Sequence, residues 1–254
     1  MSAVVLLHAF PLDHRMWDSV ADDIAISGWQ VFTPDFRGCC NAADWAEGQA
    51  PSLRILAQDV LALMDQFGIE KFVVGGCSLG GYVAMELMRI APQRIAAAIF
   101  IDTKASADNE EQIANRQRIA EQVATAGSTE AFWRAMVPNV IGKSTFENSP
   151  QIVDYVKSLM SDSRVNGVVN LQNAMSQRED STSVISDFKG PLLSIRGLED
   201  TVANEADHKT IMDAACDGLH VEIANSGHLA PIENPVETAD AIIKFLGKLS
   251  SPSC

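Results

Sequence analysis

The 254-residue chain contains no apolar run of the length that a transmembrane helix needs. Its N-terminal segment MSAVVLLHAFPLDHRMW also has no basic n-region and no small-residue cleavage site, so we predict a strand there and not a signal peptide. From these absences we expect a cytoplasmic protein without a membrane partner.

Positive charge is scarce: the chain has 19 Lys and Arg against 33 Asp and Glu, a formal net charge of −14. Nucleic acids and anionic membranes attract basic proteins, so this balance argues against both as partners. We expect a small-molecule substrate as the partner, and the sequence leaves open whether the chain is a monomer or a homodimer.

Cysteine is also sparse, with five residues at irregular spacing that form neither a disulfide framework nor a zinc pattern. Cys39 and Cys40 are adjacent. We expect both to be reduced thiols in a loop and not a strained disulfide.

What the chain does contain is an ordinary globular composition, 47% apolar and 20% charged, in a length that suits one large α/β domain. Short β-branched runs alternate with helical patterns, which predicts a mainly parallel sheet flanked by helices. The predicted strands are 4–7, 30–33, 71–75, 95–101, 191–195 and 220–223.

Residues 104–187 break this alternation, because they are polar and helix-prone and contain no strand-like run. The segment is longer than one crossover connection requires. We therefore predict a helical lid at 104–187, inserted between two parts of the core domain, 1–103 and 188–254.

The segment GCSLG at residues 76–80 matches the pattern G-x-S-x-G. A strand that turns sharply into a helix leaves no room for side chains two positions on either side of the bend, which explains the glycines. Ser78 would then sit at a helix N-terminus, where backbone N–H groups favour negative charge. The pattern arises by chance in about one such chain in ten, so the prediction of a catalytic serine depends on the strand before it and the helix after it.

A serine hydroxyl is a poor nucleophile unless a base removes its proton. His228 lies between the last predicted strand and the last predicted helix, and Asp200 follows the strand 191–195. We predict a triad of Ser78, His228 and Asp200. Asp102, at the end of the fourth strand, is the alternative acid, and Glu199 is a further rival.

The other histidines fit a base less well. His8 ends the first strand, where we expect it to fix the neighbouring loop, and His14 precedes the nucleophile near the mouth of the site. His208 and His220 are expected to face solvent.

An oxyanion needs two backbone N–H donors. Leu79, directly after the serine, supplies one in our prediction. Phe10 supplies the other from the loop after the first strand, since Pro11 has no N–H.

Four segments, LLHAFPLDHRMW, PDFRG, GCSLGG and SGHLAPIENP, together resemble the α/β-hydrolase superfamily, and the small lid-bearing esterases and lactonases most closely. The resemblance covers nearly the whole chain and implies an α/β-hydrolase fold of about six strands without the customary N-terminal hairpin. Two departures are Ala9 in place of the usual glycine, and Cys39-Cys40 where many relatives have His-Gly.

The resemblance implies a carboxylesterase-like serine hydrolase that cleaves a small ester, lactone or thioester through an acyl-enzyme, without a metal or organic cofactor. The same triad also serves C–C bond hydrolysis, perhydrolysis, hydroxynitrile lyase chemistry or slow ligand sensing. For the substrate pocket we predict Trp133, Met136, Phe132 and Trp45. An apolar lid with few basic residues favours an uncharged or modestly sized substrate.

Overall fold

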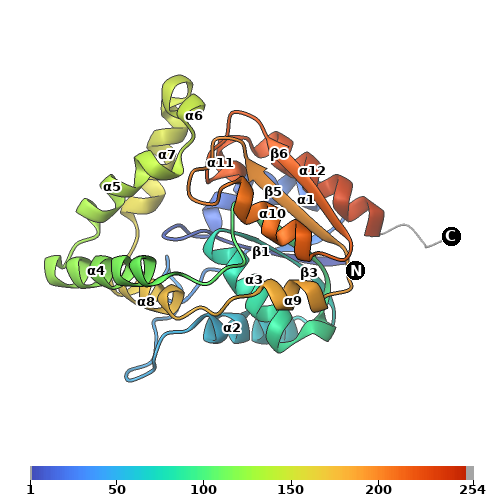
Figure 1. Ribbon diagram of the computed structural model, residues 1–254, viewed down its shortest axis with the longest axis horizontal. Helices are drawn as coiled ribbons and strands as arrows, with labels where there is room; N and C mark the ends of the chain where they lie inside the picture. Colours follow the sequence, from blue (N-terminus) through green and yellow to red (C-terminus); the bar gives the residue numbers. More distant parts are fainter. Residues whose placement is uncertain (1, 250–254) are drawn as a thin grey trace.

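A single parallel sheet of six strands forms the centre of the computed structural model, which describes residues 2–249 (Figure 1). The spatial order of the strands is β2-β1-β3-β4-β5-β6. The sheet confirms the predicted fold class and number of strands. The strands are β1 (Ala3–Leu7), β2 (Gln30–Phe32), β3 (Phe72–Cys77), β4 (Ile95–Ile101), β5 (Leu192–Gly197) and β6 (Gly218–Ile223).

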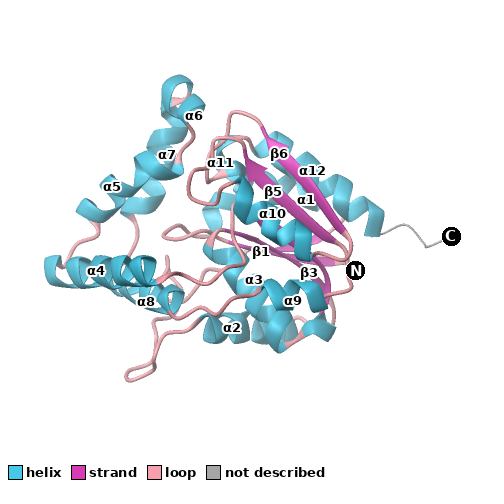
Figure 2. Ribbon diagram, in the orientation of Figure 1, coloured by secondary structure: helices cyan, strands magenta, loops and turns pink. Residues whose placement is uncertain are grey.

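Helices cover both faces of this sheet (Figure 2). Alternate strand residues point to opposite faces, so Val5 and Leu7 pack under one helical layer while Val4 and Leu6 pack under the other. The first layer contains α2 (Leu53–Gln66), α3 (Leu79–Ile90) and α10 (Glu205–Ala214). The second contains α1 (Asp18–Ile26) and α12 (Pro235–Leu249). This burial on both faces explains the continuous apolar runs in the sequence.

Only helices occur between β4 and β5, in the segment predicted to be a lid. In Figure 1, helices α4 to α8 extend to one side of the sheet, while α9 returns to the core beside α3. Residues 250–254, assigned in our prediction to the second core part, lie outside the described residues. The six helices are α4 (Glu110–Ala126), α5 (Glu130–Val140), α6 (Lys143–Asn148), α7 (Pro150–Ser161), α8 (Val165–Ser176) and α9 (Thr182–Asp187).

The short elements complete the layout: two 3-10 turns, η1 (His14–Trp17) and η2 (Pro92–Arg94), and the one-turn helix α11 (Ala230–Glu233). Across residues 2–249, no helix is both long enough and apolar enough to cross a bilayer. Cys39, Cys40, Cys77 and Cys216 are free thiols, and Cys254 lies outside the described residues.

The prediction that His208 faces solvent is wrong, because its side chain is only 1% exposed. Helix α10 is polar in composition, but it packs the face that carries His208 and Ile211 onto the sheet. The Nδ1 atom of His208 lies 2.7 Å from Ser194 Oγ, and His220 Nδ1 lies 3.2 Å from the same hydroxyl. Burial lowers the pKa of His208 to about 3, so this imidazole is neutral at physiological pH.

Candidate active site

Ser78 occupies the sharp turn between β3 and α3, with φ 52° and ψ −113°. This is a conformation that residues with a side chain rarely adopt. The neighbouring glycines have the steric role that the sequence predicted. A Cβ on Gly76 would overlap the carbonyl group of Gly80, and a Cβ on Gly80 would overlap the carbonyl group of Leu7.

A hydrogen-bonded chain links Ser78, His228 and Asp200. His228 Nε2 lies 2.8 Å from Ser78 Oγ, and His228 Nδ1 lies 2.8 Å from Asp200 Oδ2. The other oxygen of Asp200 accepts hydrogen bonds from the backbone N–H groups of Val202 and Ala203. With Nδ1–H donating to Asp200, Nε2 is free to accept the serine proton, which is the geometry that a general base requires.

Opposing effects set the pKa values of this pair. Burial alone would lower the pKa of His228, but the charge of Asp200 and its hydrogen bond outweigh burial and raise the pKa above its usual value. Burial would raise the pKa of Asp200, yet His228 and the two backbone donors hold that pKa below its usual value. Asp200 is therefore ionised and stabilises a protonated His228.

Asp102, the alternative acid, has a different set of contacts. Its Oδ1 accepts from the N–H of Gly197 at 2.7 Å, and its Oδ2 accepts from the N–H of Ala230 at 3.0 Å. Burial and the nearby Asp200 charge raise the pKa of Asp102 to about 8. Asp102 thus joins the end of β5 to the start of α11, and it is Asp200 that contacts the imidazole.

A second buried carboxylate, Glu233, fastens the histidine loop to the α5–α6 junction. Its Oε1 accepts from the N–H groups of Gly227 and Leu229, on either side of His228, and its Oε2 accepts from Gly142 N–H at 2.7 Å. The His228 N–H donates to the carbonyl of Val140 at 3.0 Å. Glu233 was not predicted from the sequence, because an acidic residue in a short helix is usually exposed and only the fold shows that this one is buried.

In the part of the chain that the structure describes, the backbone N–H groups of the two predicted oxyanion donors are without an acceptor. Leu79 is the first residue of α3, so its N–H has no partner within the helix. Among residues 2–249, no acceptor pairs with the N–H of Phe10, and Phe10 lines the same cavity as Ser78 and His228. Both donors therefore remain available to a bound oxyanion.

A cavity of about 780 Å³ opens over Ser78 and His228 and is walled largely by α4, α5 and α8. Met136 and Phe132 line it as predicted, but Trp133 and Trp45 do not. Trp133 lies on the other side of α5, where it packs against the apolar side chains under the second helical layer and against Arg134. Trp45 is buried among the apolar side chains under the first helical layer.

The cavity is more polar and more basic than the sequence suggested, since three basic side chains line it. Arg116 lines it and pairs with Asp108, a single carboxylate that is shared with Arg178. Arg118 lines it too, and its guanidinium donates only to the neutral side chains of Asn115 and Gln122 among the described residues. Lys104 lines it as well and forms no ion pair with any residue in 2–249. Its Nζ donates only to the carbonyl of Val202, two residues beyond Asp200, at 3.4 Å.

Comparison with known proteins agrees with this architecture. The family model described as the alpha/beta hydrolase fold matches residues 2–235. The chain is 27% identical to 3-oxoadipate enol-lactonase 1 of Acinetobacter baylyi over 241 residues, which cover 92% of this chain and 84% of that enzyme.

Solved structures have the same fold. A thermophilic esterase from Thermogutta terrifontis, solved with malate bound, aligns with a TM-score of 0.94 at 29% identity, over 99% of this chain and 91% of that one. A bromoperoxidase from Bacillus anthracis aligns with a TM-score of 0.84 at 19% identity, over 97% and 92%. The match over nearly the whole length shows that the chain belongs to the α/β-hydrolase family.

Proposed function

We propose that this protein is a serine hydrolase that cleaves small carboxylic esters or lactones. The hydrogen-bonded chain from Ser78 through His228 to Asp200, open to a cavity of about 780 Å³, is the observation that carries the proposal. The names of the enol-lactonase and esterase relatives support the same reaction class.

In the proposed mechanism, Ser78 Oγ attacks the substrate carbonyl while His228 Nε2 takes the serine proton. The Asp200 carboxylate stabilises the resulting imidazolium, and the N–H groups of Phe10 and Leu79 stabilise the oxyanion. His228 then protonates the leaving oxygen. A water that His228 deprotonates next releases the acid from Ser78 and restores the enzyme.

We further propose that preferred substrates carry a carboxylate beside the reacting group. In a chain with net charge −14, Lys104 is a cation without an ion-pair partner in the described part of the cavity wall. Such a cation attracts and orients an anionic substrate. One relative is named for a lactone of 3-oxoadipate, a dicarboxylic acid, and the esterase structure contains malate.

Steady-state rates on p-nitrophenyl esters from acetate to decanoate test the reaction class. We expect turnover whose dependence on acyl chain length reports how much of the cavity of about 780 Å³ the acyl group can fill. The mono-p-nitrophenyl ester of glutarate, measured beside the neutral butyrate ester, tests the carboxylate preference. Absence of turnover on every ester would refute the esterase activity, whereas equal rates on the two matched esters would refute only the preference.

Replacing Lys104 with methionine should lower kcat/KM for the glutarate ester by about tenfold, the effect of losing one charge-assisted hydrogen bond at a partly exposed site. The butyrate ester should change by less than about twofold, because it has no anion to lose contact with. Lys157→Met in α7 is the matched control, since it removes one positive charge, paired with Asp154, from a partly exposed position outside the cavity lining. An equal loss on both esters would contradict carboxylate recognition by Lys104.

A further inference from the structure

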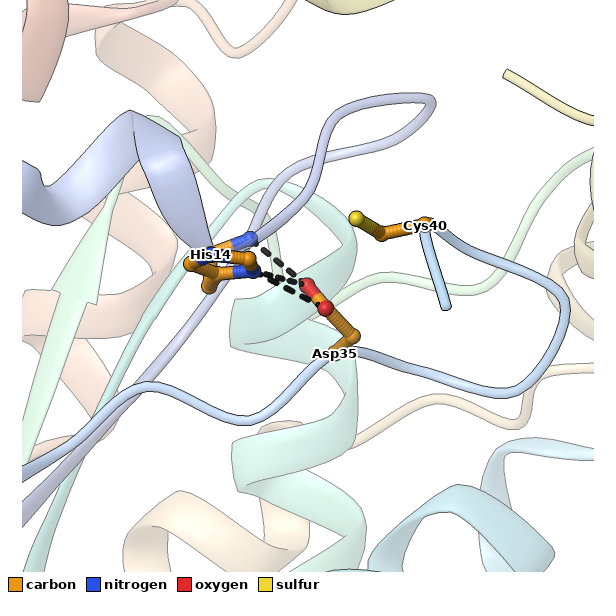
Figure 3. A group of neighbouring side chains, drawn as sticks. All are labelled: His14, Asp35 and Cys40. Carbon is orange, nitrogen blue, oxygen red and sulfur yellow. Dashed lines mark hydrogen bonds and ion pairs between the residues drawn. The ribbon is translucent and has the colours of Figure 1, made fainter. Parts of the chain in front are cut away.

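Three side chains of metal-ligating type converge where η1 meets the segment that follows β2 (Figure 3). They are His14, Asp35 and Cys40, and one ligand atom of each lies within 4.8 Å of the others. All three are half-buried, so the group is both held in place and open to solvent. None of them takes part in the hydrogen-bonded chain of Ser78, His228 and Asp200.

The existing contacts already orient two of these groups. The backbone N–H of His14 donates to Asp35 Oδ1 at 2.7 Å, and His14 Nδ1 lies 2.9 Å from both carboxylate oxygens. The backbone contact does not involve the imidazole. The carboxylate therefore stays in place when a metal ion replaces the proton on Nδ1.

Cys40 supplies the third group from an unusual backbone conformation. Its φ is 45°, in the left-handed region where a residue with a side chain costs about 1–2 kcal/mol and glycine is favoured. A cysteine held there with its sulfur near an imidazole and a carboxylate is an outlier that no role in the core explains, because the side chain is only half-buried.

We propose that His14 Nδ1, Asp35 and Cys40 Sγ bind a divalent transition-metal ion, with Zn²⁺ as the ion that fits best. Zinc accepts imidazole, carboxylate and thiolate ligands together, whereas Mg²⁺ and Ca²⁺ select oxygen ligands. A water molecule from the open side completes the tetrahedron. One carboxylate and one thiolate balance the two charges of the ion.

The geometry requires only small adjustments. Zinc–ligand bonds of about 2.0–2.3 Å place tetrahedral ligand atoms roughly 3.3–3.6 Å apart. The His14–Asp35 contact must widen by a few tenths of an ångström, and the Cys40 sulfur must move inward by at most roughly 1.5 Å, within reach of a side-chain rotation.

The sequence shows no zinc motif because the ligands come from two loops that meet only in the fold, η1 and the segment after β2. An ion there would join the segment that follows Phe10 to the loop at residues 35–40. We therefore expect saturating Zn²⁺ to raise Tm, since a ligand that binds only the folded state stabilises it.

Cobalt substitution tests the site, because a thiolate on Co²⁺ gives a sulfur-to-metal charge-transfer band. Chelator-treated protein titrated with Co²⁺ should show this band at one ion per chain, and Zn²⁺ should abolish it. The band and the Zn²⁺-dependent rise in Tm should both be lost in Cys40→Ser, and cobalt affinity should fall at least tenfold in His14→Ala.

The matched control is the double variant Cys216→Ser, Cys254→Ser, which keeps Cys40 while Cys39 and Cys77 remain buried. It should retain the band and the rise in Tm. A wild type without the band, or a Cys40→Ser variant that keeps it, would overturn the proposal. Circular dichroism and the metal-free Tm of each variant identify a variant that has lost its fold, and His14→Gln then replaces His14→Ala.

Discussion

Ser78→Ala is expected to lower kcat by about 10⁴–10⁶, the largest effect of any single substitution in this protein. The hydroxyl lies 2.8 Å from His228 Nε2, and no described group near that nitrogen could replace it as nucleophile. Initial rates on p-nitrophenyl butyrate, with enzyme concentrations high enough to measure the variant, give the ratio.

The control for this substitution is Ser161→Ala, at the exposed end of α7, which should leave kcat unchanged. A fluorophosphonate probe should label the wild type and the control at one site per chain and leave Ser78→Ala unlabelled. Equal rates in wild type and Ser78→Ala would contradict the serine mechanism. Labelling without steady turnover would instead favour a slow ligand-sensing role.

Asp200→Asn is expected to lower kcat by about 10⁴, as the loss of the orienting acid does in other serine hydrolases. The amide cannot stabilise the imidazolium and favours the wrong tautomer of His228, whose Nδ1 lies 2.8 Å from the Asp200 oxygen. Asp102→Asn is the matched substitution. It loses one backbone hydrogen bond, so its main effect should be a fall of about 1–3 kcal/mol in the free energy of unfolding.

The pH dependence of kcat/KM is a second, independent way to decide whether Asp200 or Asp102 orients His228. The base must be neutral, so activity falls as pH falls through the pKa of His228, which Asp200 raises. Removing the Asp200 charge lowers this pKa, and the acidic limb of the kcat/KM profile should move to lower pH in Asp200→Asn. A larger loss of kcat and a larger shift of this limb in Asp102→Asn would assign the orienting role to Asp102.

The sheet and the hydrogen-bonded residues Ser78, His228 and Asp200 could be predicted because each leaves a pattern in its own stretch of sequence. A strand buried on both faces must be apolar throughout, and the turn at Ser78 must have glycines around it, so both leave a pattern in the chain. The order of residues also placed Asp200 and His228 after late strands, at the edge where parallel strands end. These features depend on neighbours within a few positions.

The cavity wall could not be predicted in the same way. Successive residues on a helix point about 100° apart, so Phe132, Trp133 and Met136 cannot all face the same side of α5. Which face meets the cavity depends on how α5 packs on α7 and the core, and that packing is tertiary. The burial of His208 was missed for the same reason, since a polar helix composition does not reveal the single inward face.

The attachment of the histidine loop to Gly142 limits how this enzyme can be re-engineered by exchanging parts. A Cβ on either Gly142 or Gly227 would overlap the other segment, and Glu233 joins the two by backbone hydrogen bonds. A lid taken from a relative would therefore also need an α5–α6 junction that fits against the His228 loop. Helices α4 and α8 of the lid form no hydrogen bond to the His228 loop among the described contacts. They are therefore the part of the lid that can be exchanged to change substrate selectivity without altering the position or the pKa of His228.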